Sequence, residues 1–176
     1  PYTTLFRSLI LAMQEAGADL IEIGIPFSDP VAEGPVIQEA DDRALSAGVT
    51  TDKIFDMVDD IADKIHVPIV FMTYINPIYV YGVEKFAKRA KACGAAGVIV
   101  PDVPFEEKEE IRGSFEAEGL VVISMVTPTS ADRVRMIAKE AKGFLYCVSS
   151  LGVTGVRTEI GTAIGDLIQT VKEECS

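Results

Sequence analysis

Several residue types are scarce in this chain of 176 residues, and each scarcity narrows its possible functions. Tryptophan is absent, histidine occurs once, and 16 basic residues stand against 27 acidic ones, for a net charge of −11. This balance argues against a nucleic-acid or polyphosphate surface as the partner. It still allows a small anionic ligand, because helix N-termini and glycine-rich loops bind phosphate through backbone N–H groups.

Cysteine and long apolar runs are also scarce. Cys93, Cys147 and Cys175 show neither a CxxC nor a Cys/His spacing, so we expect free thiols in a reducing compartment rather than a metal site or disulfides. No apolar run approaches the length of a membrane span. The chain also does not open with the charged residues followed by an apolar run that are typical of a signal peptide. With 48% hydrophobic residues, these features predict one globular, soluble and cytoplasmic domain.

Short runs of β-forming residues alternate with helical patterns along the chain, as in βαβ units of a parallel sheet. We predict strands at residues 18–24, 68–73, 97–100, 120–124 and 144–148, and helices at 9–16, 36–47, 52–65, 83–93, 105–118, 131–142 and 163–174. Residues 74–77 are predicted as a loop.

The polar, Pro-rich and Gly-rich segments follow strands rather than helices, which favours a (β/α)8 TIM barrel with its site at the carboxyl ends of the strands. The main rival is an open doubly wound sheet, but no GxGxxG turn follows the first strand. About five strands of the eight are recognisable, so we expect an incomplete barrel over residues 9–176. Residues 1–8 fit neither pattern, and we expect them to lie outside this domain.

Two carboxylates stand out in residues 20–35. Strand alternation places Glu22 opposite a face of isoleucines, and Glu33 follows in a Pro/Gly-rich loop. A strand glutamate can simply sit on a half-exposed face. If the sheet is covered, however, Glu22 loses solvation and its pKa rises into the range useful for proton transfer.

Three segments resemble, in order and spacing, the signatures of the tryptophan synthase alpha chain family. They are residues 22–38 (EIGIPFSDPVAEGPVIQ), 101–104 (PDVP) and 152–155 (GVTG); the first is long and distinctive. The resemblance runs from about residue 16 to the last residue. It implies a (β/α)8 barrel from which the first strand and the last two strands are missing here.

The resemblance implies a carbon–carbon lyase that cleaves indole-3-glycerol phosphate to indole and glyceraldehyde 3-phosphate, with no metal or organic cofactor. Glu22 matches the family's acid/base position. Glu33 matches the position of a carboxylate that stabilises positive charge on the indole nitrogen, where the family usually has Asp. A solvated loop glutamate is the alternative for Glu33.

Further residues match family positions around the substrate. Tyr74 and Tyr146 are expected to line the indole site, although either could instead be a packing aromatic. Gly155, in the Gly-rich loop 149–159, is expected to contact the phosphate through its backbone N–H. Asp102 follows a strand, where a turn or cap role is favoured over catalysis, and His66 precedes a strand and receives no chemical role.

The family resemblance also implies a partner, a pyridoxal-phosphate-dependent beta chain in an alpha2-beta2 heterotetramer, and we expect Pro30, Asn76 and Pro77 to contact it. Two other functions stay open at this point. One is another phosphate-binding barrel enzyme, such as a sugar-phosphate isomerase or epimerase. The other is a catalytically silent interaction fragment, because a chain lacking barrel strands is expected to be inactive alone.

Overall fold

The computed structural model describes residues 2–148 and 163–174. All of its strand pairs are parallel. A four-stranded sheet contains β1 (Ile21–Gly24), β2 (Ile69–Met72), β3 (Gly97–Ile99) and β4 (Val121–Val122), in that order. A second pair joins β5 (Ser124–Val126) to β6 (Leu145–Cys147).

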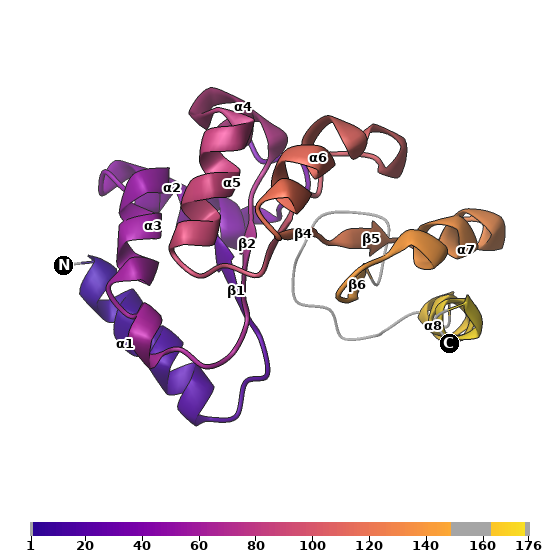
Figure 1. Cartoon of the computed structure of the whole chain (residues 1–176), viewed down its shortest axis with the longest axis horizontal. Helices are drawn as coiled ribbons and strands as arrows, with labels where there is room; N and C mark the ends of the chain where they lie inside the picture. Colours follow the sequence, from indigo (N-terminus) through magenta and orange to yellow (C-terminus); the bar gives the residue numbers. More distant parts are fainter. Residues whose placement is uncertain (1, 149–162, 175–176) are drawn as a thin grey trace.

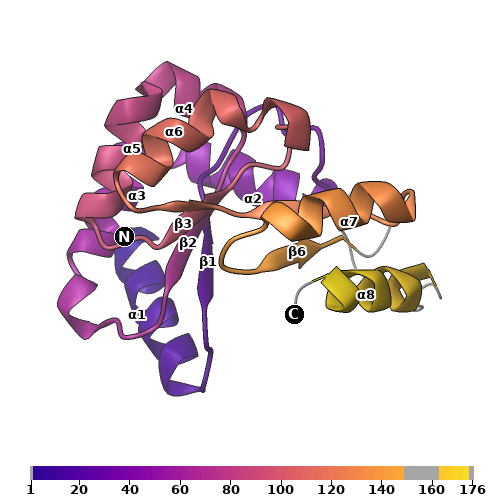
Figure 2. The same ribbon diagram turned by 45° about the vertical axis from the view of Figure 1, so that its right-hand side comes forward.

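Helices connect successive strands, so the chain is built from βα units (Figures 1 and 2). They are α1 (Tyr2–Glu15), α2 (Pro35–Ser46), α3 (Thr51–Asp59), α4 (Ile75–Tyr81), α5 (Val83–Ala92), α6 (Glu109–Ala117), α7 (Ala131–Glu140) and α8 (Ala163–Glu174). Two 3₁₀ helices, η1 (Ala62–Lys64) and η2 (Phe105–Glu107), complete the described elements. Within these elements, no helix is both long enough and apolar enough to cross a membrane.

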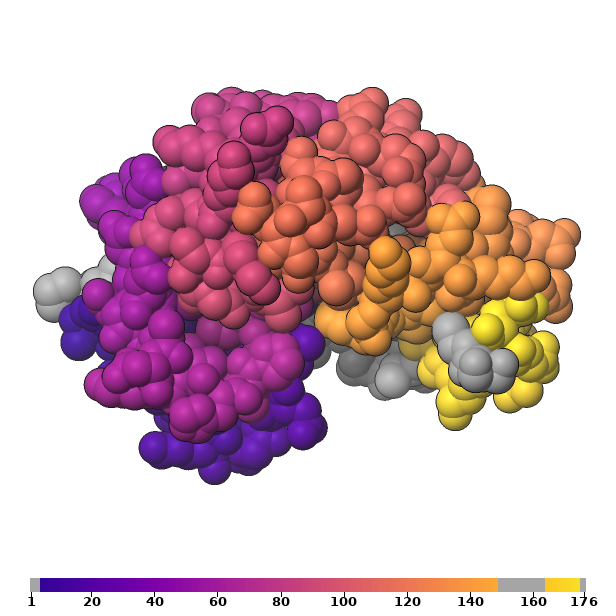
Figure 3. Space-filling model, in the orientation of Figure 1, coloured from indigo at the N-terminus to yellow at the C-terminus, as the bar shows by residue number. Residues whose placement is uncertain are grey.

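The order of the strands follows their order in the chain, as in a barrel, whereas a doubly wound sheet reverses its order at a switch point. One run of chain links the two sheets, because β4 pairs with β3 and β5 pairs with β6. The Ile123 N–H between them donates to the Val98 carbonyl at 2.9 Å. Among the described strands β1 pairs only with β2 and β6 only with β5, and α1 and α8 lie at opposite ends of the molecule (Figure 3).

The sheet separates two apolar layers. Outward-facing strand residues such as Ile21, Phe71 and Val98 pack against the helices in the larger core. Val70, Ile99 and Ile123 form a smaller cluster on the opposite, inner face, with Tyr146 packed beside them. Because Glu22 is in register with Val70, it also lies on the inner face.

Most predicted elements are confirmed, with shifted ends, and five differ. The predicted helices 52–65 and 105–118 are each divided into an α-helix and a 3₁₀ helix, α3 with η1 and α6 with η2. Helix α1 begins at Tyr2 rather than at residue 9; its first turn is rich in Thr, whose weak helix propensity hides it in the sequence. The run 120–124 is divided at Ile123, where the chain changes its pairing partner. Residues 75–81 form α4, which the prediction assigned in part to a loop; Pro77 lies in its first turn, where a missing N–H costs nothing.

Candidate active site

Glu22 lies on β1 at the inner face of the sheet, but its side chain is exposed to solvent. The predicted burial is therefore wrong, because no described strand pairs with the second edge of β1 and the inner face is open there. The predicted rise in pKa is confirmed. Although the side chain reaches solvent, the protein around its carboxyl group removes part of its hydration. This partial loss of solvation raises the pKa of Glu22 above its ordinary value of 4.5, and the negative charge of Glu33 adds to the effect.

Glu33 lies in the loop between β1 and α2 and is only 9% exposed. Its backbone carbonyl accepts a hydrogen bond from Gln38 Nε2 at 2.9 Å, and its Oε1 lies 3.5 Å from the hydroxyl of Tyr74. A solvated loop residue is thus excluded. The loop instead holds Glu33 inside the protein, where its charge reaches the neighbouring titratable groups.

Tyr74 follows β2 and is 4% exposed. Its ring packs against Phe27 with 5.6 Å between the centroids, and its hydroxyl accepts a hydrogen bond from the Ala32 N–H at 3.0 Å. Burial raises the pKa of Tyr74 to about 12, so the phenol stays neutral at physiological pH. The structure gives Tyr74 a packing role beside Glu33, while contact with substrate stays a prediction.

Tyr146 lies on β6, partly buried in the inner-face cluster. Its pKa is raised, first by burial and then by the negative charges of Glu22 and Glu33. The two carboxylates and this phenol, from opposite ends of the described strand order, therefore share one electrostatic environment. The roles of these three residues toward a substrate stay predictions.

Asp102, which follows β3, has the cap role that the sequence favoured. Its two carboxylate oxygens accept the Ile75 N–H at 3.0 and 3.3 Å, at the first residue of α4. Asn76 and Pro77 lie in that same first turn, where Asn76 is exposed and Pro77 partly exposed. Pro30, in the loop that carries Glu33, is also partly exposed. Contact of these residues with a partner stays a prediction.

Asp41 on α2 is a carboxylate that the sequence analysis missed. Burial raises its pKa, a hydrogen bond from the Phe27 backbone lowers it, and the charge of Glu33 raises it further. The sequence could have drawn attention to Asp41, because it lies a few residues after Glu33 on the helix that begins within the same motif. Gly155, the predicted phosphate contact, lies outside the described residues.

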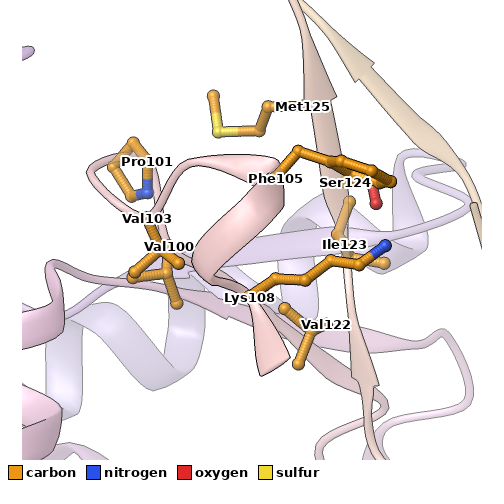
Figure 4. Close-up of a pocket in the computed structure, with 9 residues that line it drawn as sticks. All are labelled: Val100, Pro101, Val103, Phe105, Lys108, Val122, Ile123, Ser124 and Met125. Carbon is orange, nitrogen blue, oxygen red and sulfur yellow. The ribbon is translucent and has the colours of Figure 1, made fainter. Parts of the chain in front are cut away.

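Two cavities lie beside the carboxyl ends of the strands. A pocket of about 300 Å³ extends from Ala32 to Val126, Thr127 and Val148. A smaller cavity of about 50 Å³ separates the 100–108 segment from β4 and β5, and Figure 4 shows Phe105 and Lys108 reaching from that segment toward the strand. Neither cavity is lined by a predicted catalytic residue, although Ala32 precedes Glu33.

Metal ligands do not gather in the described part of the chain, where no three His, Cys, Asp or Glu side chains lie close enough to hold an ion. The chemistry that the residues present can perform is proton transfer and charge stabilisation. A carboxyl group with a raised pKa is protonated more readily than an ordinary one, which suits it to proton transfer. A second, fixed carboxylate can stabilise a developing positive charge.

Comparisons with known proteins agree with one another. The family model described as tryptophan synthase alpha chain matches residues 1–176. The chain is 48% identical to the tryptophan synthase alpha chain of Geobacillus kaustophilus over 165 residues, which are 93% of this chain and 62% of that relative. It is 47% identical to the one from Halalkalibacterium halodurans, over 96% of this chain and 64% of that relative.

Solved structures give the same result for the fold. Tryptophan synthase subunit alpha from Campylobacter jejuni superposes with a TM-score of 0.84 at 32% identity, over 98% of this chain and 70% of that one. A chain from the tryptophan synthase a2b2 complex of Pyrococcus furiosus superposes with a TM-score of 0.85 at 39% identity, over 99% and 69%. The predicted barrel fold is thereby confirmed, and the chain spans 62% and 64% of the length of the two curated relatives above.

Proposed function

This chain belongs to the tryptophan synthase alpha chain family, and from that premise we propose that it carries the catalytic carboxylates of a lyase in tryptophan biosynthesis. The substrate is indole-3-glycerol phosphate, cleaved in the cytoplasm to indole and glyceraldehyde 3-phosphate. The observation that carries the proposal is the placement of two carboxylates on one β-strand and its following loop, Glu22 on the inner face of β1 and buried Glu33 just after it. Both charges contribute to the raised pKa of Tyr146.

The reaction breaks one carbon–carbon bond and moves two protons. The ring carbon that bears the glycerol phosphate side chain must gain a proton, and the side-chain hydroxyl next to the breaking bond must lose one as it becomes the aldehyde. Glu22 serves both steps, because a carboxyl group can donate a proton and later accept one, and a raised pKa makes its protonated form more accessible. Glu33 supplies a fixed negative charge near the ring nitrogen, which becomes positive when the ring is protonated.

Phosphate binding and closure over the substrate belong, in this proposal, to the loop that contains Gly155 and to the βα units that the longer relatives have in addition. Binding energy at a remote phosphate lowers the barrier as well as KM. The 176-residue chain alone is therefore expected to show no measurable cleavage. Turnover by the isolated chain at rates near those of a whole family member would contradict this part.

The roles of the two carboxylates are tested in the chain extended to the length of its relatives. Glu22→Gln should abolish turnover and leave substrate binding largely intact, because the amide keeps its size but carries no transferable proton. Glu33→Ala should lower kcat roughly 10²–10³-fold, while Glu33→Asp should be tolerated. Glu39→Gln, on an exposed position of α2, is the matched control. Normal turnover in Glu22→Gln would remove Glu22 from the mechanism.

We propose a pyridoxal-phosphate-dependent beta chain as the partner, which consumes the indole. Support comes from the similar Pyrococcus furiosus structure, which is of a tryptophan synthase a2b2 complex. Near the strand ends of this chain, Asn76 is exposed and Pro30 and Pro77 are partly exposed. A pull-down of the extended chain with a beta chain compares wild type with Pro30→Asp and Asn76→Arg. Gln169→Arg on α8 is the control, and undiminished binding in both variants would place the interface elsewhere.

A further inference from the structure

Three neighbouring loops at the carboxyl ends of β1, β2 and β3 are joined by side-chain hydrogen bonds. Asp102, after β3, accepts the N–H of Ile75 after β2. Tyr74, also after β2, accepts the N–H of Ala32 after β1, the residue before Glu33. A continuous path of contacts therefore runs from Asp102 to the loop that carries Glu33.

The first link fixes the start of α4. Tyr74 is the N-cap residue of this helix, but its side chain makes no cap hydrogen bond. Asp102 supplies that bond from another loop, with both oxygens near the Ile75 N–H. A charged acceptor at a helix N-terminus satisfies an otherwise unpaired donor and interacts favourably with the helix dipole. Asp102 thus determines where α4 begins and where the Tyr74 backbone lies.

The second link fixes the loop before α2. The Tyr74 ring is held by burial and by the Phe27 ring, so its hydroxyl has a defined position. That oxygen accepts the Ala32 N–H at 3.0 Å and lies 3.5 Å from Glu33 Oε1, toward which its own proton can point. A neutral phenol in this place anchors the backbone of the loop and faces the carboxylate without repelling it.

We propose that Asp102 and Tyr74 are positioning residues that together hold the Glu33 carboxylate in its working place. The inference rests on the proposed function, because it assumes that Glu33 stabilises charge in the reaction. Neither residue needs to touch the substrate for this role. Displacement of a catalytic group by about 1 Å can cost up to about 100-fold in rate, so Tyr74, which bonds the Glu33 loop, and Asp102, which fixes the Tyr74 backbone, together limit such displacement.

Amide hydrogen exchange tests the geometric part on the 176-residue chain, without any activity. Tyr74→Phe keeps the ring and removes the acceptor, so exchange at Ala32 should become about 5- to 10-fold faster, the scale of one lost hydrogen bond. Tyr79→Phe, which removes another α4 hydroxyl, one bonded to exposed Glu110, should leave Ala32 unchanged. Unaltered protection of Ala32 in Tyr74→Phe would overturn the second link.

Two substitutions at Asp102 distinguish the effect of losing its hydrogen bond from the general effect of changing its side chain. Asp102→Ala removes the acceptor and should speed exchange at both Ile75 and Ala32. Asp102→Asn retains one carbonyl oxygen and should restore most of the protection at both amides. Faster exchange at Ile75 with no change at Ala32 would overturn the path between the loops.

Kinetics of the extended protein test the consequence for Glu33. Tyr74→Phe and Asp102→Ala should each lower kcat roughly 10-fold, with KM within twofold and with rescue by Asp102→Asn. In a Glu33→Ala background, Tyr74→Phe should have no further effect, because residues that act through one group are not additive. Additive losses would overturn the positioning role. Unchanged turnover in Glu33→Ala would instead refute the proposed role of Glu33, a result distinct from the exchange measurements.

Discussion

The two parts of the described chain bury their apolar residues to different extents. The first part, β1–β4 with α1–α6, has a core in which Phe55, Phe71, Phe86 and Phe115 are fully buried. The second part, β5, β6, α7 and α8, has a small cluster of Val126, Val134, Ile137 and Leu167. All three residues of β6 remain partly exposed.

This difference bears on the site, because the two parts contribute unlike groups to it. Glu22 and Glu33 belong to the first part, where packed aromatic rings hold strands and helices together. Tyr146 belongs to the second part, where fewer side chains hold β6. Dense packing permits few side-chain arrangements, so the carboxylates have the more rigid support. The following four experiments test this contrast.

The largest effect is expected from removing a core aromatic in the first part. Phe55 packs edge-on against Phe71, Tyr81 and Phe86, with centroid distances of 5.1 to 5.8 Å. Phe55→Ala should lower the free energy of unfolding by about 3–5 kcal/mol, against about 2 kcal/mol for Ile137→Ala in the second part. Urea unfolding measures both values. Equal losses would show that the two cores are equally well packed.

A methyl group between two strands of the first part should have the next largest effect. A Cβ added to Gly97 on β3 would lie 2.4 Å from the Val121 carbonyl oxygen on β4, so the strands must separate. Gly97→Ala should cost about 1–3 kcal/mol. Gly113→Ala on α6, where nothing lies within 4 Å of the added atom, should be neutral or slightly stabilising. A tolerated Gly97→Ala would indicate loose pairing of β3 with β4.

Removing one helix cap in each part gives a smaller, local effect. Thr50 accepts the Lys53 N–H at the start of α3, and Ser130 accepts the Arg133 N–H at the start of α7. Thr50→Ala and Ser130→Ala should each cost about 1 kcal/mol in thermal or urea unfolding. A much smaller loss of stability for Ser130→Ala than for Thr50→Ala would strengthen the contrast between the two parts, because it would show that α7 contributes little to the cooperative unfolding transition.

The smallest effect concerns the charge on the open inner face. The pKa of Glu22 is higher in the folded protein than its ordinary value of 4.5, so ionisation opposes folding as pH rises above that value. Glu22→Gln should therefore raise stability at pH 7 by less than about 1 kcal/mol, since water screens the exposed side chain. The gain should vanish below about pH 4, where Glu22 is protonated in both states. A constant gain at all pH values would assign it to packing instead.

Local patterns were sufficient to predict much of the fold. The strands at β1, β2 and β3 follow from runs of β-branched residues, and the helix caps Thr50 and Ser130 are of residue types that commonly begin helices. The start of α4 was missed because Asn76 and Pro77 are also typical of loops. The break at Ile123 depends on which strand lies on either side, and a single segment contains no information about its neighbours.

The candidate site, like the fold, was predicted only in part. Glu22 and Glu33 were predicted from one stretch of sequence and its family resemblance. The exposure of Glu22 could not be predicted, because it depends on whether another strand covers the second edge of β1. The approach of Tyr74 to Glu33 and that of Asp102 to Ile75 join residues distant in the sequence. The sequence did indicate that Glu33, Tyr74 and Asp102 follow successive strands, which places them at one end of the barrel.

The agreement between strand order and chain order has a consequence for synthesis on the ribosome. A protein chain emerges at about 5–20 residues per second, and here every described strand after β1 except β5 pairs with the strand made just before it. Ser124 pairs with nearby Leu145, whereas Ile21 pairs with Ile69, across the longest interval between paired strands. The nascent sheet can therefore grow at one edge while translation continues, and β1 is the strand that stays longest without a partner.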